Sequence, residues 1–542
     1  MNCLLISLQS SSYVTGLKYI AANVLDKGHD ARILLLPGYL QPTLDPAIRD
    51  FIRDYNPDLI GIGLMSIEFY SAKNLTRLLR EEFDIPIMWG GVHVTINPDD
   101  CLEHADYICL GEGEKAVVSL LGHLRENGRN ILPAIPGIWS RHQGRIMRSD
   151  NPPEMNLDSL PVQEYLPDYF YGFHKKRIYN FAHNPKLFRN YALYGGINHM
   201  MITSRGCPFN CGYCANAALV KVYGRKVRER SVENCIEELK RVKQDRHVLY
   251  INFQDDCFFI HSRAWIHEFC EAYKKHIKLP FMIRAIPTIL DREKLYMLKD
   301  AGLSIVVMGI QSGSDRVNLD IYGRKIHFRS VEKATALIAE ARVFPYYEMI
   351  VDNPYETEED MAETIESMTR IRKPYTISLS HLTFFPGTPL TQKALADNII
   401  DPEAYLSRYM VNIDYTYLNK LLYMVPYLPP FVIRYLNKPS ASRKQVHSFC
   451  THSLFFLVKR SIEPFVFMFL ITRSLDYNVT RTVKTVLGNW KSALAKFIFN
   501  FLCKSDMEFD QRLEVARKEM PSLFENQNHR DTTPEYKKVS CQ

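Results

Sequence analysis

Three cysteines lie close together in the segment RGCPFNCGYCAN, where Cys207, Cys211 and Cys214 form a C-x3-C-x2-C spacing. Three thiolates on a loop interrupted by glycine and proline can bind three irons of a four-iron cluster and leave the fourth iron without a protein ligand. A substrate or cofactor can bind that open iron and receive an electron there. The spacing therefore predicts redox chemistry rather than a closed structural metal site.

The other cysteines do not complete a different kind of site. A structural zinc site usually takes four ligands in two separated pairs, and the sequence has no second C-x2-C pair. Cys235, Cys257 and Cys270 are irregularly spaced within apolar segments and are expected to be buried free thiols. A disulfide framework is not expected in a chain of 542 residues without a secretory signal.

Size and composition indicate an ordinary globular protein with several domains. The chain has 542 residues, enough for about two to four domains, with 46% hydrophobic and 23% charged residues and a formal net charge of +7. Its first residues, MNCLLISLQ, lack the basic region and apolar length of a signal peptide and predict a first strand. Reduced thiols and an oxygen-sensitive cluster together predict a cytoplasmic location.

Residues 1–130 predict a doubly wound, Rossmann-like parallel α/β sheet, because short apolar runs alternate with amphipathic helical patterns. The predicted strands are Cys3–Leu8, Ala31–Leu36, Leu59–Leu64, Ile85–Trp89 and Tyr107–Leu110. Ligands of such sheets bind at the carboxyl ends of the strands.

Two glycine turns follow predicted strands of this first sheet, Gly90-Gly91-Val92-His93 and Gly111-Glu112-Gly113-Glu114. Glycine lets the backbone approach a large flat or phosphorylated ligand, although these glycines could equally serve only to make tight turns. No G-x-G-x-x-G follows the first strand, so an ordinary dinucleotide site is not expected.

Residues 131–195 read as an irregular, proline-rich connection, and residues 196–400 predict a partial βα barrel. Its predicted strands are His199–Thr203, Val248–Phe253, Phe281–Ala285, Ser304–Ile310, Tyr346–Val351 and Thr376–His381. Chemistry is expected at the carboxyl ends of these strands. The polar residues found there are Asp255, Asp256, Arg284, Gln311 and Ser312.

The cysteine segment, with Tyr213 before its last cysteine, resembles the signature of radical S-adenosylmethionine (SAM) enzymes. The segments GIQSGSDRV (309–317), NPYETEED (353–360) and FFPGTPL (384–390) are similar to later barrel motifs of that superfamily. Residues 55–118 resemble the N-terminal domain of its cobalamin-binding subgroup. The similarity covers roughly residues 1–400.

The resemblance implies a mechanism in which the open iron chelates the amino and carboxylate groups of SAM. One-electron reduction then gives methionine and a 5′-deoxyadenosyl radical, which abstracts a hydrogen atom from an unactivated position. The resemblance also implies SAM contacts for Tyr213 near the adenine and for Gln311 and Ser312 at a strand end where the family more often has Glu.

The resemblance leaves two readings for the other polar residues of the barrel. Asp255 and Asp256 fit hydrogen bonds to SAM or substrate, or caps of a helix that starts ahead of residue 261. Arg284 fits the methionine carboxylate, or an ion pair within the barrel.

The same resemblance implies cobalamin on the first domain, with Gly90, Gly91, His93, Gly111 and Glu112 as candidate contacts. Many cobalamin proteins use a D-x-H-x-x-G loop, but Asp26-Lys27-Gly28-His29 has the wrong spacing. His93 follows a strand and is either a cofactor contact or an ordinary loop histidine. Members of the subgroup without the motif bind cobalamin without a histidine ligand, and others have lost the cofactor.

Residues 401–525 predict a mainly helical, basic and apolar domain, and residues 526–542 a disordered tail. From Tyr415 to Ser505 the acidic residues are Glu463 and Asp476 only. Such helices fit an anionic membrane surface, a lid over a hydrophobic substrate, or a bundle packed against the barrel. Charged residues and a proline at 459–464 interrupt the longest apolar run, so a membrane span is not expected. No nucleic-acid partner is expected.

These patterns together predict a cobalamin-dependent radical SAM enzyme, most plausibly a methyltransferase at an unactivated carbon. The expected substrate is hydrophobic, such as an isoprenoid lipid or a tetrapyrrole-like molecule, and the expected electron donor is a reduced ferredoxin or flavodoxin. One alternative is a radical SAM enzyme for cyclisation, oxidation or carbon–carbon coupling without methyl transfer. The other is a non-enzymatic iron–sulfur sensor.

Overall fold

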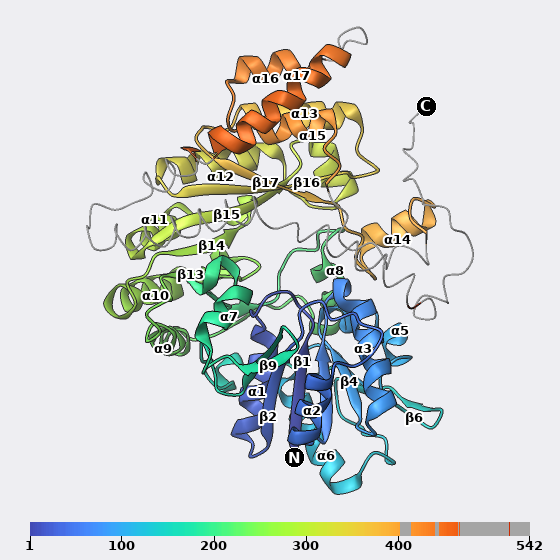
Figure 1. The fold of residues 1–542 in the computed structure, drawn as a ribbon. Coiled ribbons are helices and arrows are strands. Elements are labelled where there is room, and N and C mark those ends of the chain that lie inside the picture. Colours follow the sequence, from blue (N-terminus) through green and yellow to red (C-terminus); the bar gives the residue numbers. More distant parts are fainter. Residues whose placement is uncertain (402–412, 439–443, 464, 467–519, 521–542) are drawn as a thin grey trace.

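The computed structural model describes residues 1–401, 413–438, 444–463, 465–466 and 520. A mixed sheet with a parallel centre and an entirely parallel sheet lie one above the other, and short helices near the C-terminal end of the described chain cover the far side of the second sheet (Figure 1). The expected tail at 526–542 and much of the expected helical domain at 401–525 lie outside the described residues. The domain boundaries at 130, 195 and 400 stay predictions.

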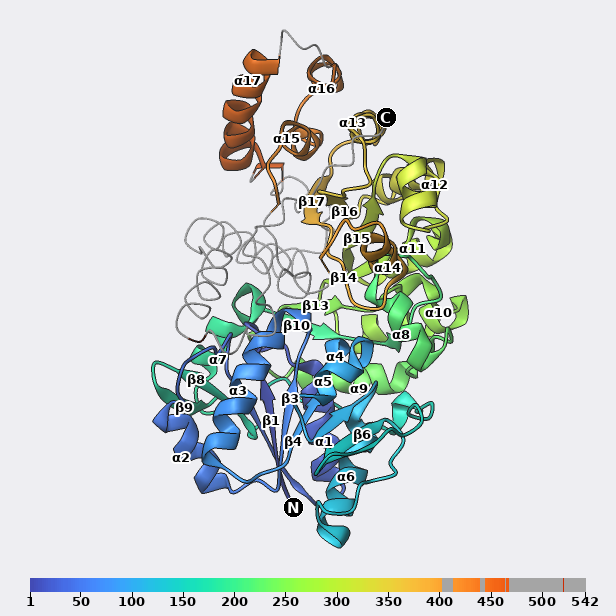
Figure 2. The same ribbon diagram turned by 90° about the vertical axis from the view of Figure 1, so that its right-hand side faces the viewer.

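The first sheet has nine strands in the order β7-β6-β5-β4-β3-β1-β2-β8-β9. All five predicted strands are present within two residues of their expected ends: β1 (Asn2–Ser7), β2 (Asp30–Leu35), β3 (Leu59–Gly63), β4 (Ile87–Gly90) and β5 (Tyr107–Cys109). They pair in parallel, with Leu5 of β1 opposite Ile33 of β2 and Gly61 of β3. Their carboxyl ends point toward the second sheet (Figures 1 and 2).

Helices cover both faces of this sheet, as the doubly wound prediction requires. One face carries α1 (Thr15–Asp26) and α6 (Gly113–Asn127), and the other carries α2 (Pro46–Tyr55) and α3 (Phe69–Glu82). Side chains of β1 alternate between the two apolar cores, because successive residues of a strand point to opposite faces.

The interpretation of residues 131–195 as an irregular connection is wrong for part of the segment. It adds two hairpins, β6 (Ile138–His142) with β7 (Arg145–Met147) and β8 (Phe170–His174) with β9 (Arg177–Asn180), at opposite edges of the first sheet. Each hairpin has a two-residue turn with both φ angles positive, 49° and 77° in one and 48° and 59° in the other. This turn geometry matches the twist of the strands that it joins.

The second sheet is entirely parallel, in the order β10-β13-β14-β15-β16-β17, and its edge strands do not pair with each other in the described residues. Its strands are β10 (Asn198–Met201), β13 (Tyr250–Phe253), β14 (Phe281–Ala285), β15 (Leu303–Gln311), β16 (Phe344–Val351) and β17 (Thr376–His381). All six predicted strands are thus confirmed. Helices α9 (Val232–Val242), α10 (Arg263–His276), α11 (Arg292–Ala301), α12 (Phe328–Glu340) and α13 (Glu358–Thr369) alternate with them.

Short helices follow the second sheet: α14 (Pro389–Ala396), α15 (Tyr417–Met424), α16 (Pro430–Leu436) and α17 (Lys444–Leu457). Asn437 donates a hydrogen bond to the carbonyl of Ala362, 2.9 Å away, which joins the end of α16 to α13. In the described part of the chain, no helix has the length and apolar character that crossing a membrane requires.

Candidate functional site

The cysteine loop lies between a short ribbon and a helix. Strand β11 (Ser204–Arg205) pairs with β12 (Arg228–Glu229) in an antiparallel ribbon directly before the loop, and α8 (Ala215–Tyr223) starts directly after Cys214. Gly206 makes the turn out of the ribbon with a φ of 102°, a conformation that side chains rarely adopt. The centre of the loop is fixed at Gly212, which donates to the carbonyl of Tyr322 at 2.7 Å.

The three thiols of the loop are free, half-buried and close enough to influence one another electrostatically. Burial raises the pKa of Cys207 to about 12 and that of Cys214 to about 11. Tyr213 donates a hydrogen bond to Cys211, and its ring meets that of Tyr322 edge-on at 4.9 Å.

This donor set fits an iron–sulfur cluster. In the described residues, no three His, Cys, Asp or Glu side chains converge on one metal position. A four-iron cluster needs no such convergence, because each cysteine binds a different iron. Backbone N–H groups of Phe209 and Asn216 point at the sulfurs of Cys207 and Cys214, and hydrogen bonds to cluster sulfurs tune a cluster's potential.

Arg324 belongs to this site, although no sequence motif identified it. Its side chain is buried, interacts with Cys211, and donates to the carbonyls of Ile310 at 2.7 Å and Gly309 at 2.6 Å. The arginine therefore joins the cysteine loop to the carboxyl end of β15. Because it is distant from the cysteines in sequence, spacing could not identify it.

Asp255 and Asp256 follow β13 as expected, but they lie in different surroundings. Asp255 is fully buried, and its Oδ1 accepts hydrogen bonds from the Thr203 backbone, the Thr203 hydroxyl and the Ser204 hydroxyl, at 3.0, 2.6 and 2.6 Å. It thus holds the segment that enters the β11–β12 ribbon. Neither aspartate caps α10, whose cap is Ser262.

Asp256 lies beside the cysteine loop. Its carboxylate interacts with Cys207 and Cys214 and accepts a hydrogen bond from Asn216. The side chain is accessible to solvent but surrounded by enough protein that desolvation raises its pKa, an effect that Asn216 partly offsets. Its expected contact with SAM or substrate stays a prediction.

The remaining candidate SAM contacts lie at the carboxyl ends of the central strands. Arg284 is ion-paired with Glu348 of β16 at 3.2 Å, which is the alternative considered for it above. Gln311 has a φ of 71°, an unusual backbone conformation at the end of β15. Ser312 is buried, and its hydroxyl lies 2.9 Å from that of Thr364, so its side chain already has a partner within the protein.

The glycine turns of the first domain approach other parts of the protein. A Cβ on Gly91 would stand 2.5 Å from the carbonyl oxygen of Leu64, and a Cβ on Gly111 would stand 3.1 Å from the Tyr223 ring of α8. Gly90 ends β4, and its carbonyl accepts from the backbone of Leu64 at 2.9 Å. Tight packing between loops explains these glycines, as the tight-turn alternative supposed.

Glu112 and His93 both have partners inside the protein. Glu112 forms two hydrogen bonds to Arg228, at 2.8 and 2.5 Å, and lies 2.9 Å from Arg205. Burial alone would raise the pKa of Glu112, but these guanidinium groups outweigh burial and lower it. His93, on α4 (Val92–Ile96), is fully buried with Nδ1 2.9 Å from the Ser66 hydroxyl, and burial lowers its pKa to about 4. The Glu112 side chain is 11% exposed, and the expected contacts of Glu112 and His93 with cobalamin stay predictions.

Two apolar side chains fit a flat macrocycle better than the predicted residues do. Met65 follows β3, Val92 follows β4, and their side chains are 44% and 41% exposed at the carboxyl edge of the sheet. An exposed apolar surface at the strand ends of such a sheet suits a large ring lying flat on it. Met65 directly follows a predicted strand and Val92 lies in the predicted glycine turn after the next one, which was the available sequence signal.

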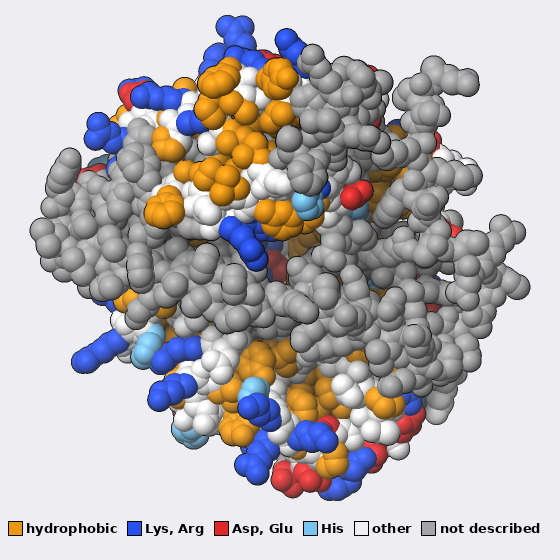
Figure 3. All heavy atoms as spheres, turned by 45° about the horizontal axis from the view of Figure 1, so that its top comes forward, with side chains coloured by type: hydrophobic (Ala, Val, Ile, Leu, Met, Phe, Trp, Pro, Cys, Tyr) orange, Lys and Arg blue, Asp and Glu red, His pale blue; other side chains and the backbone are white. Residues whose placement is uncertain are grey.

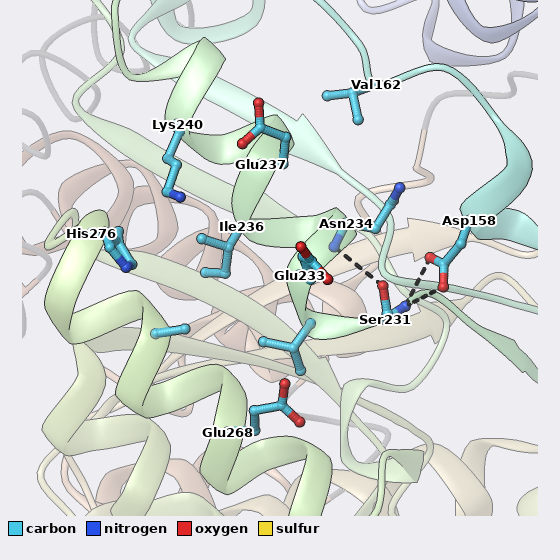
Figure 4. A pocket seen from close by; sticks show the side chains of 12 residues that line it. Asp158, Val162, Ser231, Glu233, Asn234, Ile236, Glu237, Lys240, Glu268 and His276 are labelled. Carbon is cyan, nitrogen blue, oxygen red and sulfur yellow. Dashed lines mark hydrogen bonds between the residues drawn. The ribbon is translucent and has the colours of Figure 1, made fainter.

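A separate pocket of about 580 Å³ lies on the outside of the second domain, between α9 and α10 (Figure 4). Val232, Ile236 and Ala272 line it together with Glu233, Glu237 and Glu268. None of the three loop cysteines lines this pocket, so it is not the cluster site.

Comparisons with known proteins agree with this architecture. The Radical SAM superfamily profile matches residues 201–368, and the B12 binding domain profile matches residues 1–121. The chain belongs to the radical SAM superfamily and has an N-terminal B12-binding domain. This membership confirms the predicted family, fold class and enzyme class, and it implies a 4Fe–4S cluster, SAM and cobalamin as cofactors.

Several proteins are similar to this radical SAM chain over most of their length. An uncharacterised methyltransferase of Pyrococcus horikoshii is 25% identical over 395 residues, which cover 71% of this chain and 79% of the relative. The anaerobic magnesium-protoporphyrin IX monomethyl ester cyclase of Rubrivivax gelatinosus is 23% identical over 390 residues, covering 70% and 65%. The solved structure of the cobalamin-dependent SAM radical enzyme OxsB with aqua-cobalamin bound shares the fold, with a TM-score of 0.62 at 14% identity, covering 97% of this chain and 80% of that one.

Proposed function

We propose that this radical SAM enzyme is a methyltransferase that acts at an unactivated carbon. One structural observation carries the proposal: the crevice loops of the B12-binding domain pack directly against the segments that flank the cysteine loop. The similarity to a methyltransferase over 71% of the chain supports it. When bound, the cluster supplies an electron to cleave SAM, and cobalamin carries the methyl group.

Residues of this chain hold and surround those cofactors. Cys207, Cys211 and Cys214 ligate the cluster. Tyr213 and Arg324 donate hydrogen bonds to the sulfur of Cys211. Asp256 and Gln311 provide polar groups at the strand ends beside the cluster. Exposed Met65 and Val92 support the cobalamin ring.

The substrate is a hydrophobic or tetrapyrrole-like molecule in this proposal, and an acidic carrier such as ferredoxin or flavodoxin donates the electron. The second candidate function is radical cyclisation without methyl transfer. The similarity to a magnesium-protoporphyrin ester cyclase supports both the tetrapyrrole class and this second function.

We also propose that the C-terminal helices contact an anionic membrane surface. Figure 3 shows hydrophobic side chains gathered on the face that carries these helices, with Lys and Arg side chains at the border. The exposed large apolar side chains of α16, of α17 and of the residues after α17 are called the C-terminal apolar surface below: Phe431, Tyr435, Phe456, Leu457 and Phe465. Exposed aromatic side chains beside basic ones suit the boundary between headgroups and acyl chains.

Anoxic purification and product analysis test the proposed function. We expect the broad visible absorption of a four-iron cluster, bound corrinoid, and formation of both S-adenosylhomocysteine and 5′-deoxyadenosine from SAM. The Cys207→Ala variant should lose the absorption, whereas Cys257→Ala, which removes a buried thiol close to Cys207, should keep it. Production of 5′-deoxyadenosine alone would favour the cyclase, and an iron-free protein that still turns over SAM would refute both functions.

A further inference from the structure

Four charged side chains form a partly buried cluster between the two domains, with 4% of the Glu114 side chain, 11% of Glu112 and Arg228 and 21% of Arg205 exposed. Glu112 and Glu114 come from the loop and helix start after β5, and Arg205 and Arg228 come from the β11–β12 ribbon. Arg205 lies 2.9 Å from Glu112 and 2.7 Å from Glu114, and Arg228 forms a forked pair with Glu112. Two planar guanidinium groups thus share one carboxylate, a geometry that fixes orientation as well as charge.

The cluster balances two like charges that face each other across the ribbon. Arg205 and Arg228 stand directly opposite each other in the antiparallel ladder, where like charges repel. Glu112 lies between them and offsets that repulsion. Because Cys207 is two residues after Arg205, the position of Glu112 bears directly on the start of the cysteine loop.

The helix that follows the cysteine loop contacts the same part of the first domain at its far end, Tyr223. Gly111 packs against Tyr223 of α8, the helix that starts after Cys214, and its N–H donates to the Thr95 hydroxyl of α4 at 3.0 Å. Helix α4 itself follows Gly91 and the exposed Val92. The loops after β4 and β5 therefore contact both the ribbon before the cysteine loop and the far end of the helix after it.

We propose that Glu112 is a positioning residue that couples cobalamin binding in the crevice to the conformation of the cluster loop. The inference rests on the proposed cofactor sites and goes beyond them, since it assigns Glu112 to neither cofactor. Occupancy of the crevice favours one arrangement of the loop at residues 111–114, and the Glu112–Arg205–Arg228 contacts carry that preference to Cys207. Because coupling is reciprocal, the assembled cluster tightens cobalamin binding by the same factor.

The test measures the dissociation constant of hydroxocobalamin for the full chain under anoxia, with the cluster removed and with it reconstituted. In the unaltered protein we expect cluster assembly to tighten binding about fivefold or more, the usual lower range of coupling between sites. The Glu112→Gln variant should bind with the same constant in both forms, within about twofold. A purely structural role would weaken binding in both forms and leave their ratio unchanged.

Glu154→Gln is the matched control, because Glu154 pairs with Lys226 at the surface near the same ribbon, with side chains 53% and 72% exposed. The Glu154→Gln variant should retain the full ratio between the cobalamin dissociation constants measured without and with the cluster. If Glu112→Gln does not fold, Arg228→Lys, which keeps the charge but loses the fork, should give an intermediate ratio. Two results overturn the inference. In one, the unaltered protein binds iron and cobalamin, but the dissociation constants of cobalamin without and with the cluster are equal. In the other, Glu112→Gln keeps the full ratio of these two constants. A protein that binds neither cofactor refutes the proposed function instead.

Discussion

Two neighbouring aspartates, Asp255 and Asp256, differ in burial and in the groups that they contact. Asp255 and Asp256 both follow β13, yet Asp255 is fully buried beneath the entry to the ribbon and Asp256 faces the cysteine loop. The buried carboxylate satisfies three donors from Thr203 and Ser204. Losing it would leave the Thr203 N–H and the Ser204 hydroxyl without their acceptor in a buried environment, whereas the Thr203 hydroxyl also lies 2.8 Å from His261 Nε2.

Asp255→Ala should therefore destabilise the second domain by about 3 kcal/mol or more, since each stranded buried donor costs roughly 1–3 kcal/mol. Asp255→Asn keeps an acceptor oxygen and should cost less. The control is Asp256→Ala, for which we expect a change below about 1 kcal/mol. Urea unfolding at neutral pH measures all three, and equal losses for the alanine variants at 255 and 256 would contradict this assignment.

For individual residues, the sequence predicted where side chains lie better than it predicted which side chains they contact. Cysteine spacing and the carboxyl ends of parallel strands indicated which side chains gather around the second sheet, because that geometry is local. Glu112 and Arg228 are 116 residues apart, and their contact depends on how two domains dock. The sequence could therefore indicate that Glu112 lies at the crevice but not that two arginines bind it.

Two glycines of the first domain, one in a turn and one inside a helix, should respond to alanine substitution in opposite ways. Gly91 has a φ of 107° and a Leu64 carbonyl 2.5 Å from where a Cβ would stand, whereas Gly122 lies inside α6 with nothing within 4 Å of that position. Gly91→Ala should destabilise the first domain by more than about 2 kcal/mol, because both the conformation and the contact oppose a side chain. Gly122→Ala should stabilise it by about 0.5–1 kcal/mol, as alanine does in a helix interior.

Thermal unfolding of the two glycine variants checks the comparison. A shift of the same sign in both would show that backbone geometry at Gly91 does not control the fold. The Gly91 variant should also bind less cobalamin, because α4 and Val92 follow the strained turn directly.

The elements that the sequence missed share a physical reason. Each regular strand of the two sheets appears as an apolar run, but β6 to β9 are edge hairpins with many polar or exposed residues. Their turns, Gln143-Gly144 and Lys175-Lys176, adopt positive φ angles, and the second contains none of the residues that usually favour that conformation. Pairing with the edges of an existing sheet, rather than local preference, makes these residues strands.

One fully buried histidine, His93, and one partly buried histidine, His104, give the first domain a defined response to acid. Burial lowers the pKa of His93 and of His104 from 6.5 to about 4, and both rings lie within 6 Å of the Phe69 ring. The unfolded chain binds protons more readily than the folded one below pH 6.5. The stabilisation is therefore complete above pH 6.5 and is lost as the pH falls toward 4, by up to about 3 kcal/mol per histidine.

Amide exchange of α3 and α4 should accordingly speed up between pH 6.5 and 4.5, after correction for the intrinsic rate. His104→Gln should reduce this dependence, whereas His183→Gln, which changes an exposed histidine, should not. A pH dependence that survives His104→Gln and His93→Gln together would place its origin elsewhere.

The complete molecule is held together by apolar contact as well as by charge. One apolar core runs from Leu5 and Leu121 in the first domain through Phe253 in the second to Leu422 of α15. A second charged network joins Tyr19 of α1 to Glu238 of α9 at 3.1 Å, with Arg230 2.7 Å from the same carboxylate. Domain-by-domain sequence patterns predicted the parts, but the shared core arises only when complementary faces meet.

The C-terminal apolar surface contains the most exposed large apolar side chains of the described residues. Phe431 of α16 and Phe465 are 73% and 78% exposed. The basic side chain of Arg460 is also exposed, five residues before Phe465. At an anionic membrane, burial of the apolar side chains and attraction of the basic ones to the lipid would both favour binding.

We expect the protein to sediment with vesicles that contain phosphatidylglycerol and to bind phosphatidylcholine vesicles more weakly, with the difference falling as salt screens the charges. Phe431→Ala and Phe465→Ala should each weaken binding to the anionic vesicles by about tenfold, because each removes an aromatic ring from the contact. Tyr296→Ala is the control, since Tyr296 is 39% exposed on α11 and outside the surface. Equal binding to both vesicle types, or loss of binding in all three variants, would show that these exposed rings are not a membrane contact and would leave packing against another protein surface as the reason for their exposure.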